Sequence, residues 1–579
     1  MLFNSIEFAL FLPIVFLLYW FVFDYALRGC KRQLWWQNLF VLVASYVFYG
    51  WWDWKFLLLI ALTTLCSYGS GLLIAKACER QNPMGGGNSS HGSIARIADD
   101  APRPLPPPRK RGGGVGETAQ QAQIEGCGME TAQQAQIEGC GLETAPPFRK
   151  RFWLWANVLL NLGILGVFKY YDFFVESFAR LFGVDAEAHL LHLVLPVGIS
   201  FYTFQALSYS IDVYKGKIAA TRDLVAFAAF LSFFPQLVAG PIERATNLLP
   251  QFQQRRVFDY QQAVDGMRQI LWGLFKKIVV ADNCATYVDT VFGSMGEQSG
   301  STLALAAVLF TFQIYGDFSG YSDIAIGTAK LFGIRLMRNF HVPYFSRDIA
   351  EFWRRWHISL TTWFRDYVYI PLGGSRPEVP KEAVCKFENL KICKLLFRGR
   401  LSTDGVCEAY KKAIVVRNTF VIFLLSGFWH GANWTFVLWG AYHALLFLPL
   451  ILTGKNRKYM DAPTWRDLPK ILLTFALVVF GWIIFRATGM KTLTAWVTGI
   501  FSPSFFTIPW LMNRWYYISL AISIGVMLVM EWINRREEHG LQWQSERLLG
   551  LKIVAEVLIC LWIYVFAPKA LGEFIYFQF

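Results

Sequence analysis

The chain has 579 residues, of which 55% are hydrophobic, 17% aromatic and 17% charged, and its formal net charge is +14. A soluble protein of this length carries more charge and fewer large aromatic residues, so the composition excludes an ordinary soluble fold. The positive charge fits the basic cytoplasmic loops of a membrane protein better than nucleic-acid binding, and we expect no nucleic-acid partner.

Apolar segments that are long enough to cross a bilayer recur along the chain. A spanning helix needs roughly 20 apolar residues, and lipid admits only helices or closed barrels. The sequence therefore predicts an all-α polytopic membrane protein, with one membrane domain over residues 1–579 and about a dozen membrane segments, some of them re-entrant. The expected segments are Phe8–Phe23, Leu34–Gly50, Phe56–Ala75, Phe152–Tyr170, Leu191–Ile211, Leu224–Gly240, Leu303–Phe332, Val415–Gly431, Trp434–Leu452, Ile471–Phe485, Tyr516–Trp532 and Ile553–Phe566, with further helices at Gly266–Asp282 and Ser346–Tyr367.

The charges of the loops predict how the helices cross the membrane. Basic residues follow the first, third and fifth expected segments, whereas acidic residues dominate the loop after the fourth. Because basic loops stay on the cytoplasmic side, we expect an outside N-terminus and a cytoplasmic loop at 76–151. The first segment has neither a basic leader nor a small-residue cleavage site, which favours a retained helix over a signal peptide.

Two segments interrupt the apolar pattern. Residues 81–150 are rich in Gly, Pro and Gln and contain a direct repeat, ETAQQAQIEGCGM at 117–129 and ETAQQAQIEGCGL at 130–142. This composition cannot bury enough apolar surface to fold alone, so we expect a disordered cytoplasmic loop, with a partner-binding or regulatory arm as the alternative. Residues 377–412 form a second, basic loop insertion. The ten cysteines lack paired zinc spacing, and we expect neither a metal site nor a disulfide framework.

His430 lies in the run SGFWHGANW, inside a long apolar stretch. Polar side chains at membrane depth are costly and tend to face a cavity, and an imidazole can accept and return a proton near neutral pH. Gly427, Gly431, Trp429 and Trp434 around it are typical of a lined pocket. A histidine packed in the core is the alternative, and composition alone leaves the two interpretations equal.

His357 lies in SRDIAEFWRRWHISLTTWFRDYVYIPLGG (346–374). On a continuous helix it would share one face with Trp353, Trp356, Leu360 and Phe364. An aromatic face beside arginine pairs is typical of a helix at the membrane interface. A contact between packed helices is the alternative to a functional role.

The remaining histidines and a nearby serine carry weaker signals. Ser426 precedes His430 by one helical turn, but no GxSxG motif supports a nucleophile, and no Walker A motif indicates an ATP-driven pump. His443 is expected to pack against other helices or to line a pocket. We expect surface, interface or loop positions for His91, His189, His192, His341 and His539.

Asp317 and Asp323 lie in the apolar segment QIYGDFSGYSD (313–323). Carboxylates at membrane depth need partners, and structural ion pairing is favoured over catalysis here. The partners that the sequence offers are Arg335, Arg354 and Arg355.

Five motifs together resemble a membrane-bound O-acyltransferase of the bacterial alginate O-acetyltransferase branch, which is related to the D-alanyl transfer protein of teichoic acids. They follow the family order and cover most of the chain outside the two loops. The motifs are LPVGISFYTFQALSYSIDVYKG (195–216), FFPQLVAGPIER (233–244), QIYGDFSGYSDIAIG (313–327), FWRRWHISLTTWFRDYVYIPLGG (352–374) and SGFWHGANWTFVLWGAYHA (426–444).

The resemblance implies a horseshoe of roughly 11–12 transmembrane helices, with re-entrant or interfacial helices, around a central funnel. A pocket from the cytoplasmic face would meet the funnel near the catalytic histidine of the family, which falls on His430. The second prominent histidine of the family falls on His357. The residues expected to line the acyl-donor pocket are Trp353, Trp356, Trp429, Ser426, Asn433, His443 and Asp317.

The implied reaction is acyl transfer from acetyl-CoA, or from another cytoplasmic donor, without a bound cofactor. The acetyl group is expected to reach an exopolysaccharide outside the bacterial inner membrane, through a periplasmic SGNH-type transferase. A hydroxyl that attacks a thioester must lose its proton, and a positioned histidine base accelerates such a step roughly 10²–10⁴-fold. We therefore expect His430 to be the base and His357 to orient the donor or the acceptor.

Two alternatives stay open at this point. An acyltransferase that acts on teichoic acid, lipid or protein would use the same chemistry at His430. A transporter or polysaccharide-export component would also need many helices, but internally related halves with paired broken helices are not evident in the sequence. The motifs do not fix the acceptor, and the two long loops exceed the family pattern.

Overall fold

The computed structural model describes residues 1–79, 148–238, 240–375, 403–510, 513–542, 549–567 and 574–575. Within these residues every regular element is a helix, which confirms the predicted all-α class. Most of the predicted loop 81–150, with its repeat, lies outside the described residues, and so does most of the insertion 377–412. The described part of that insertion, residues 403–412, is helical and begins α18.

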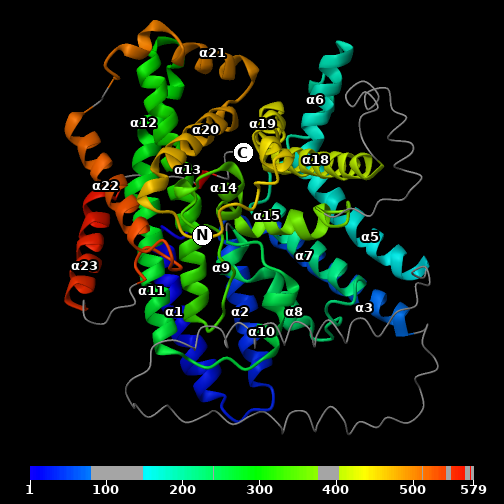
Figure 1. Cartoon of the computed structure of the whole chain (residues 1–579). Helices are drawn as coiled ribbons and strands as arrows, with labels where there is room; N and C mark the ends of the chain where they lie inside the picture. Colours follow the sequence, from blue (N-terminus) through cyan, green and yellow to red (C-terminus); the bar gives the residue numbers. More distant parts are fainter. Residues whose placement is uncertain are drawn as a thin grey trace.

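The described elements follow one another as helices joined by turns (Figure 1). The first part contains α1 (Ile6–Leu17), η1 (Leu18–Ala26), α2 (Gln33–Gly50), α3 (Lys55–Glu79), α5 (Phe148–Leu165), η3 (Gly166–Tyr170), α6 (Tyr171–Phe182), η4 (Glu187–His189), α7 (Ile199–Tyr214), α8 (Leu224–Ser232), α9 (Phe234–Leu237), α10 (Ala245–Gln253), α11 (Tyr260–Leu274), η5 (Phe275–Ala281) and α12 (Asp282–Gly293). The second part contains η6 (Met295–Glu297), α13 (Gly300–Leu331), η7 (Pro343–Phe345), α14 (Ile349–Arg355), α15 (Ile358–Phe364), η8 (Arg365–Tyr369), α18 (Thr403–His430), α19 (Trp434–Leu452), η9 (Trp465–Asp467), α20 (Leu468–Arg486), α21 (Met490–Ile500), η10 (Pro503–Phe506), α22 (Arg514–Ile533) and α23 (Leu549–Phe566).

Eight helices of the described chain are long and apolar enough to cross a membrane. This number supports a multi-pass membrane protein and is smaller than the dozen segments expected, because several of those segments are short, broken or partly polar. The eight are Ile6–Ala26, Lys55–Ala77, Phe148–Phe182, Gly300–Leu331, Gly405–His430, Trp434–Leu452, Trp465–Arg486 and Arg514–Ile533.

Two of the expected membrane segments are shortened or interrupted by local features of the backbone. In the expected segment Leu191–Ile211 the helix begins only at Ile199, after Gly198 in the left-handed region at φ +75°. The expected segment Leu224–Gly240 is interrupted at Phe233, whose extended ψ of 112° separates α8 from the short α9. Neither of these two expected segments is therefore a continuous helix long enough to cross the membrane.

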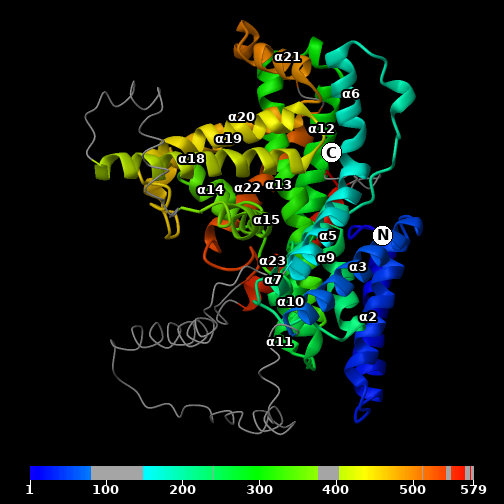
Figure 2. The same ribbon diagram turned by 90° about the vertical axis from the view of Figure 1, so that its right-hand side faces the viewer.

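The long helix α13 forms the centre of the structure, and 83% of its most apolar window is buried. In both views α11, α12 and α13 make an upright column, whereas α18 and α20 run across its direction (Figures 1 and 2). Glycines allow this close packing: a Cβ atom at Gly273 on α11 would lie 2.6 Å from the Gly320 carbonyl oxygen on α13. Small residues at such crossings are how membrane helices approach one another.

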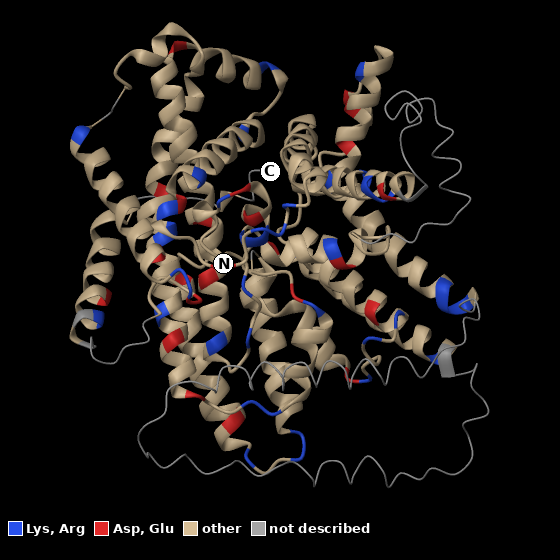
Figure 3. Cartoon of the chain, in the orientation of Figure 1, with Lys and Arg blue, Asp and Glu red and all other residues tan. Residues whose placement is uncertain are grey.

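Buried ion pairs tie α13 to the π-helical segment η5. Lys277 Nζ lies 2.6 Å from Asp317 Oδ1 and 2.7 Å from Asp282 Oδ1, and Lys276 Nζ lies 2.6 Å from Asp323 Oδ2. Figure 3 shows acidic and basic segments side by side in this part of the column. The prediction that arginines pair with Asp317 and Asp323 is therefore wrong, because two adjacent lysines on the neighbouring helix form ion pairs with both carboxylates.

The expected continuous helix Ser346–Tyr367 is also wrong, since the chain breaks between α14 and α15. Trp356 is extended, with ψ 128°, and His357 adopts the left-handed conformation at φ +45°. The shared helical face predicted for Trp353, Trp356 and His357 therefore does not form. The break turns the imidazole of His357 into the protein interior instead.

Candidate active site

His430 is the last residue of α18, where the chain turns sharply into α19. Glycines let the two helices pack closely: a Cβ atom at Gly427 would overlap the carbonyl oxygen of Phe436, and one at Gly440 would overlap that of Phe423. The close approach leaves His430 only 5% exposed. The glycines around the histidine thus serve helix packing and bury its imidazole.

Among the described residues, three aromatic side chains are found against the His430 imidazole. Trp429, Trp439 and Phe485 have their ring centroids 5.0, 5.1 and 5.3 Å away, all with steep interplanar angles. The three side chains are themselves buried. Packing of this kind keeps bulk water away from the imidazole and holds it in one orientation. A catalytic base requires such a fixed orientation.

Lys169, on η3, holds the end of α18. Its Nζ donates to the carbonyl oxygens of Trp429 at 2.7 Å and of His430 at 3.0 Å, and it lies 5.7 Å from the centroid of the Trp429 ring. The last carbonyl groups of a helix lack partners within the helix and attract cations. Sequence reasoning missed Lys169, although a lone lysine inside the expected span Phe152–Tyr170 was a signal for it.

His357 is 1% exposed and is oriented by an amide. Its Nδ1 lies 3.1 Å from Asn339 Oδ1, while Asn339 Nδ2 donates to Ser322 Oγ at 3.0 Å. Because the amide nitrogen is directed at Ser322, the amide oxygen faces the imidazole and accepts from Nδ1–H. Nε2 is consequently the basic nitrogen of His357.

Both histidines lie near Trp429, and the distance between ring centroids is 5.9 Å for His357 and 5.0 Å for His430. Both imidazoles therefore belong to one aromatic cluster, although they come from motifs far apart in the chain. The rings form a closed circuit that runs from His430 through Trp439, Trp482, Trp356, Phe340 and His357 to Trp429.

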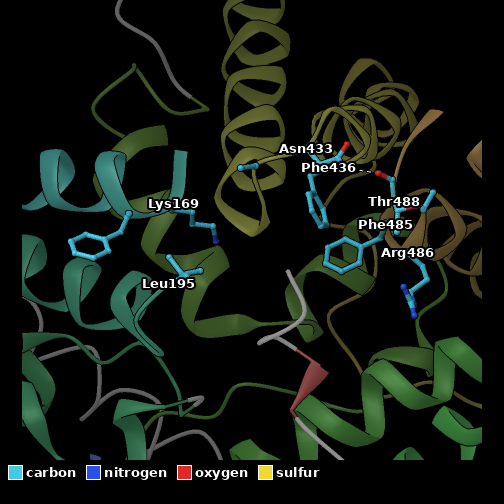
Figure 4. Close-up of a pocket in the computed structure, with 10 residues that line it drawn as sticks. Lys169, Leu195, Asn433, Phe436, Phe485, Arg486 and Thr488 are labelled. Atoms are coloured by element: carbon cyan, nitrogen blue, oxygen red, sulfur yellow. Dashed lines mark hydrogen bonds between the residues drawn. The ribbon is translucent and has the colours of Figure 1, made fainter. Parts of the chain in front are cut away.

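A cavity of about 360 Å³ lies next to the aromatic cluster around His430. Phe485 lines this cavity and also lies against the His430 imidazole, so the ring is in contact with both. Figure 4 shows Lys169 and Phe485 on facing sides. The lining residues are Phe168, Lys169, Leu195, Ala432, Asn433, Phe436, Phe485, Arg486, Ala487 and Thr488.

Trp353 and His443, expected as pocket lining, form a packed group beside the site. The His443 ring centroid lies 5.0 Å from that of Trp353 and 4.9 Å from that of Trp439. Since Trp439 also contacts His430, this group lies one ring away from the candidate base. Its contacts are those of packing, the simpler of the two roles expected for His443.

The other expected lining residues are divided between the cavity and the protein core. Asn433 lines the cavity and donates from Nδ2 to the Thr488 carbonyl oxygen at 2.8 Å. Ser426 is buried on α18, one turn before His430. Asp317 is paired with Lys277, and the neighbouring Phe318 contacts His357 at 4.7 Å between ring centroids.

Two further histidines lie outside the site. His539 was expected at the surface, but it is buried and its Nε2 lies 3.0 Å from Asp265 Oδ1. Burial raises the pKa of Asp265, but hydrogen bonds from His539 and Lys330 outweigh it and bring that pKa to about 2. His341 lies in a loop as expected, and burial lowers its pKa to about 4.

Comparison with known proteins agrees with the motifs. The model of the membrane-bound O-acyltransferase family matches residues 217–382. The chain is 36% identical over 500 residues to the probable alginate O-acetylase AlgI of Pseudomonas aeruginosa, which covers 86% of this chain and 74% of that protein. It is 34% identical to the peptidoglycan O-acetyltransferase of Helicobacter pylori, over 60% of this chain and 64% of that protein.

A more distant relative is the teichoic acid D-alanyltransferase of Bacillus subtilis, 26% identical over 51% of this chain and 69% of that protein. These relatives are all acyltransferases by name, and the similarity to the first extends over most of both chains. The chain therefore belongs to the membrane-bound O-acyltransferase family and is an O-acyltransferase.

Proposed function

We propose that this protein moves acetyl groups from a cytoplasmic donor to the hydroxyls of an extracytoplasmic polysaccharide. The observation that carries the proposal is the contact of both His430 and His357 with Trp429, beside a cavity that Phe485 lines. The relatives named for alginate and peptidoglycan acetylation support a polysaccharide as the final acceptor.

In the proposed reaction, acetyl-CoA is the donor and no bound cofactor is needed. The acceptor oxygen attacks the thioester carbonyl carbon while His430 takes the hydroxyl proton. The C–S bond then breaks, and the proton passes to the leaving thiolate, so that free CoA and an acetyl ester result. His357, whose Nε2 is basic, orients the acceptor hydroxyl or the donor.

We place the cavity on the extracytoplasmic side of a bacterial inner membrane. At 1.5 Å per residue, Lys169 lies about 32 Å along its helix from Phe148, and Phe148 belongs to the loop that the charge pattern assigns to the cytoplasm.

We also propose a periplasmic SGNH-type transferase as the partner that passes the acetyl group on to the polysaccharide. Such a relay would bring a serine hydroxyl to the cavity, which Lys169, Asn433 and Thr488 line with polar groups. D-alanylation of teichoic acid, or acyl transfer to lipid or protein, would use the same base. A role in transport alone does not account for the candidate base next to this cavity.

Analysis of surface polysaccharide tests the function directly. Deletion of the gene is expected to remove the acetyl esters of the polysaccharide, and expression of the wild-type chain is expected to restore them. Proteoliposomes that contain the full chain and its partner are expected to release free CoA from acetyl-CoA. Unchanged acetyl esters after deletion would overturn the proposal, whereas esters lost from lipid or protein would assign a different acceptor.

A further inference from the structure

An apolar groove of about 410 Å³ lies between the first turns of α20 and the last turns of α22. It shares no lining residue with the cavity beside His430. Its walls include Leu468 and Leu472 on α20 and Val529 and Ile533 on α22, and these four side chains are exposed. Both helices are long and apolar enough to cross a membrane, so the groove opens toward lipid.

Aromatic side chains close the inner side of the groove. Phe312 on α13 and Tyr344 on η7 line it and are buried. The hydroxyl of Tyr344 donates to the Thr311 carbonyl oxygen at 2.6 Å, so it is already satisfied within the protein. A sugar or a peptide backbone in this part of the groove would leave its polar groups without partners, whereas a hydrocarbon chain has none to satisfy.

Two tryptophans mark one end of the groove. Trp465 and Trp532 both line it, and their ring centroids lie 4.4 Å apart. Trp465 comes three residues before α20 begins, and Trp532 is next to the last residue of α22. Tryptophans at helix ends are typical of the headgroup level of a membrane. From there the groove extends about 10 Å along α20, from Leu468 to Phe475, into the hydrocarbon.

Two exposed arginines lie at the same end. Arg466 follows Trp465 directly, and Arg536 comes three residues after Ile533. Within the part of the chain that the structure describes, neither arginine has an ion-pair partner. Basic residues at the ends of membrane helices attract the phosphate groups of anionic lipids.

Most of the acidic groups nearby in the sequence are paired. Asp467 lies 3.2 Å from Lys470, and Glu538 lies 2.9 Å from Lys330. Glu537 is the remaining acidic residue after the end of α22. One carboxylate beside two arginines leaves an excess of positive charge at this end of the groove.

We propose that this groove binds one anionic phospholipid, with an acyl chain between α20 and α22 and its phosphate at Arg466 and Arg536. A neutral lipid could cover the same apolar walls but would gain no net attraction to the two arginines. The bound lipid stabilises α20, whose other end carries Phe485 beside the candidate site. Lipid binding uses no residue of the proposed acetyl transfer and does not depend on it.

Native mass spectrometry of the full-length protein in detergent tests the site. Phosphatidylglycerol is the anionic probe, and phosphatidylcholine with the same acyl chains is the neutral one. The wild-type protein is expected to bind phosphatidylglycerol more tightly, and this lipid is expected to raise the thermal midpoint more, because it binds the folded state. The double variant Arg466→Gln, Arg536→Gln is expected to lose up to about fivefold in phosphatidylglycerol affinity per arginine and to bind phosphatidylcholine as before.

Two further variants separate the groove from the charge. Leu472→Trp places a large side chain in the groove and is expected to weaken the binding of both lipids. Arg514→Gln is the matched control, since Arg514 is also exposed beside an exposed tryptophan, Trp515, but lies at the opposite end of α22, about 28 Å away. Its lipid binding is expected to stay unchanged. All the replaced side chains are exposed, so the thermal midpoints without added lipid are expected to match the wild type.

Several results would overturn the site. Equal binding of the two lipids by the wild type would show that charge plays no part. Unchanged phosphatidylglycerol binding by the double arginine variant, or an equal loss in Arg514→Gln, would show that these arginines do not hold the phosphate. Normal lipid binding by Leu472→Trp would place the acyl chain elsewhere. A membrane protein that copurifies with the wild type and is lost from Leu472→Trp, while lipid binding persists, would make the groove a protein interface.

Discussion

Lys169 has an unusual position for a lysine within a membrane helix. Its ammonium group is held by two carbonyl oxygens at the end of α18, one of which belongs to His430. A cation at the C-terminus of a helix stabilises the helix by about 0.3–1 kcal/mol when the cation is exposed and by up to about 2 kcal/mol when it is partly buried. Lys169 thus fixes the backbone of the candidate base without touching the reacting atoms, which makes it a positioning residue.

Replacement of this lysine should lower the turnover rate more than substrate affinity. Lys169→Met removes both hydrogen bonds, and a small displacement of a catalytic group can cost about 10²-fold in rate. We expect kcat for acetyl transfer to fall by about that factor while KM for acetyl-CoA stays near the wild-type value. Lys169→Arg, which keeps the charge and the donors, is expected to recover most of the rate. Equal losses in the two variants would assign Lys169 a purely structural role.

At the scale of secondary-structure elements, the site depends on the α18–α19 hairpin and on the break at His357. The sequence predicted the hairpin well, because the apolar runs and the glycines around His430 are local signals. It could not predict the break between α14 and α15, since the left-handed conformation of His357 is stabilised by Asn339, which is distant in sequence. The same holds for Lys169, whose role appears only when η3 packs against α18.

The close packing of the α18–α19 hairpin leads to a prediction about stability, which the addition of one methyl group at Gly440 tests. Gly440→Ala places a Cβ atom onto the carbonyl oxygen of Phe423, so α18 and α19 must separate, and overpacking of this kind costs about 1–3 kcal/mol. We expect a lower thermal midpoint and reduced acetyl transfer. Gly525→Ala is the matched control, because its Cβ meets open space and alanine favours a helix interior. A Gly440→Ala protein as stable as the wild type would contradict the close packing described here.

The loop that carries Asn339 is fastened by a buried carboxyl group. Glu243 accepts a hydrogen bond from the Met337 backbone N–H and another, of 2.7 Å, from Asn247 Nδ2. Burial raises the pKa of Glu243 from its ordinary value of 4.5 to about 7, although these hydrogen bonds oppose the rise. The folded state therefore binds the Glu243 proton more tightly than the unfolded state does.

This raised pKa predicts how stability depends on pH. The contribution of Glu243 is most favourable below its unfolded pKa and is lost as the pH rises through the folded value of about 7. Thermal unfolding of the detergent-purified protein should show a midpoint that falls between pH 5 and pH 8, and Glu243→Gln should reduce this fall. Glu297→Gln, at an exposed position, is the control. An unchanged pH dependence in Glu243→Gln would exclude Glu243 as its source.

At the scale of the whole molecule, the structure joins a column of ion-paired helices to a group of crossing helices that bear the site. The family, the helical class and the two histidines followed from motifs in the sequence, because each motif is contiguous. The cavity beside the aromatic cluster did not, because it is assembled from η3, α19 and α20, which are far apart in the chain. The proposed function depends most on the claim that His430 is the base next to this cavity.

The most direct measurement of that claim is acetyl transfer by His430→Gln, in cells and with the purified protein. Gln keeps a polar side chain of similar length but cannot take a proton, and loss of a general base costs roughly 10²–10⁴-fold in rate. We expect a loss of this size in polysaccharide acetylation, with normal protein level and normal thermal midpoint. Acetylation at the wild-type level by His430→Gln would contradict the role of His430 as the base.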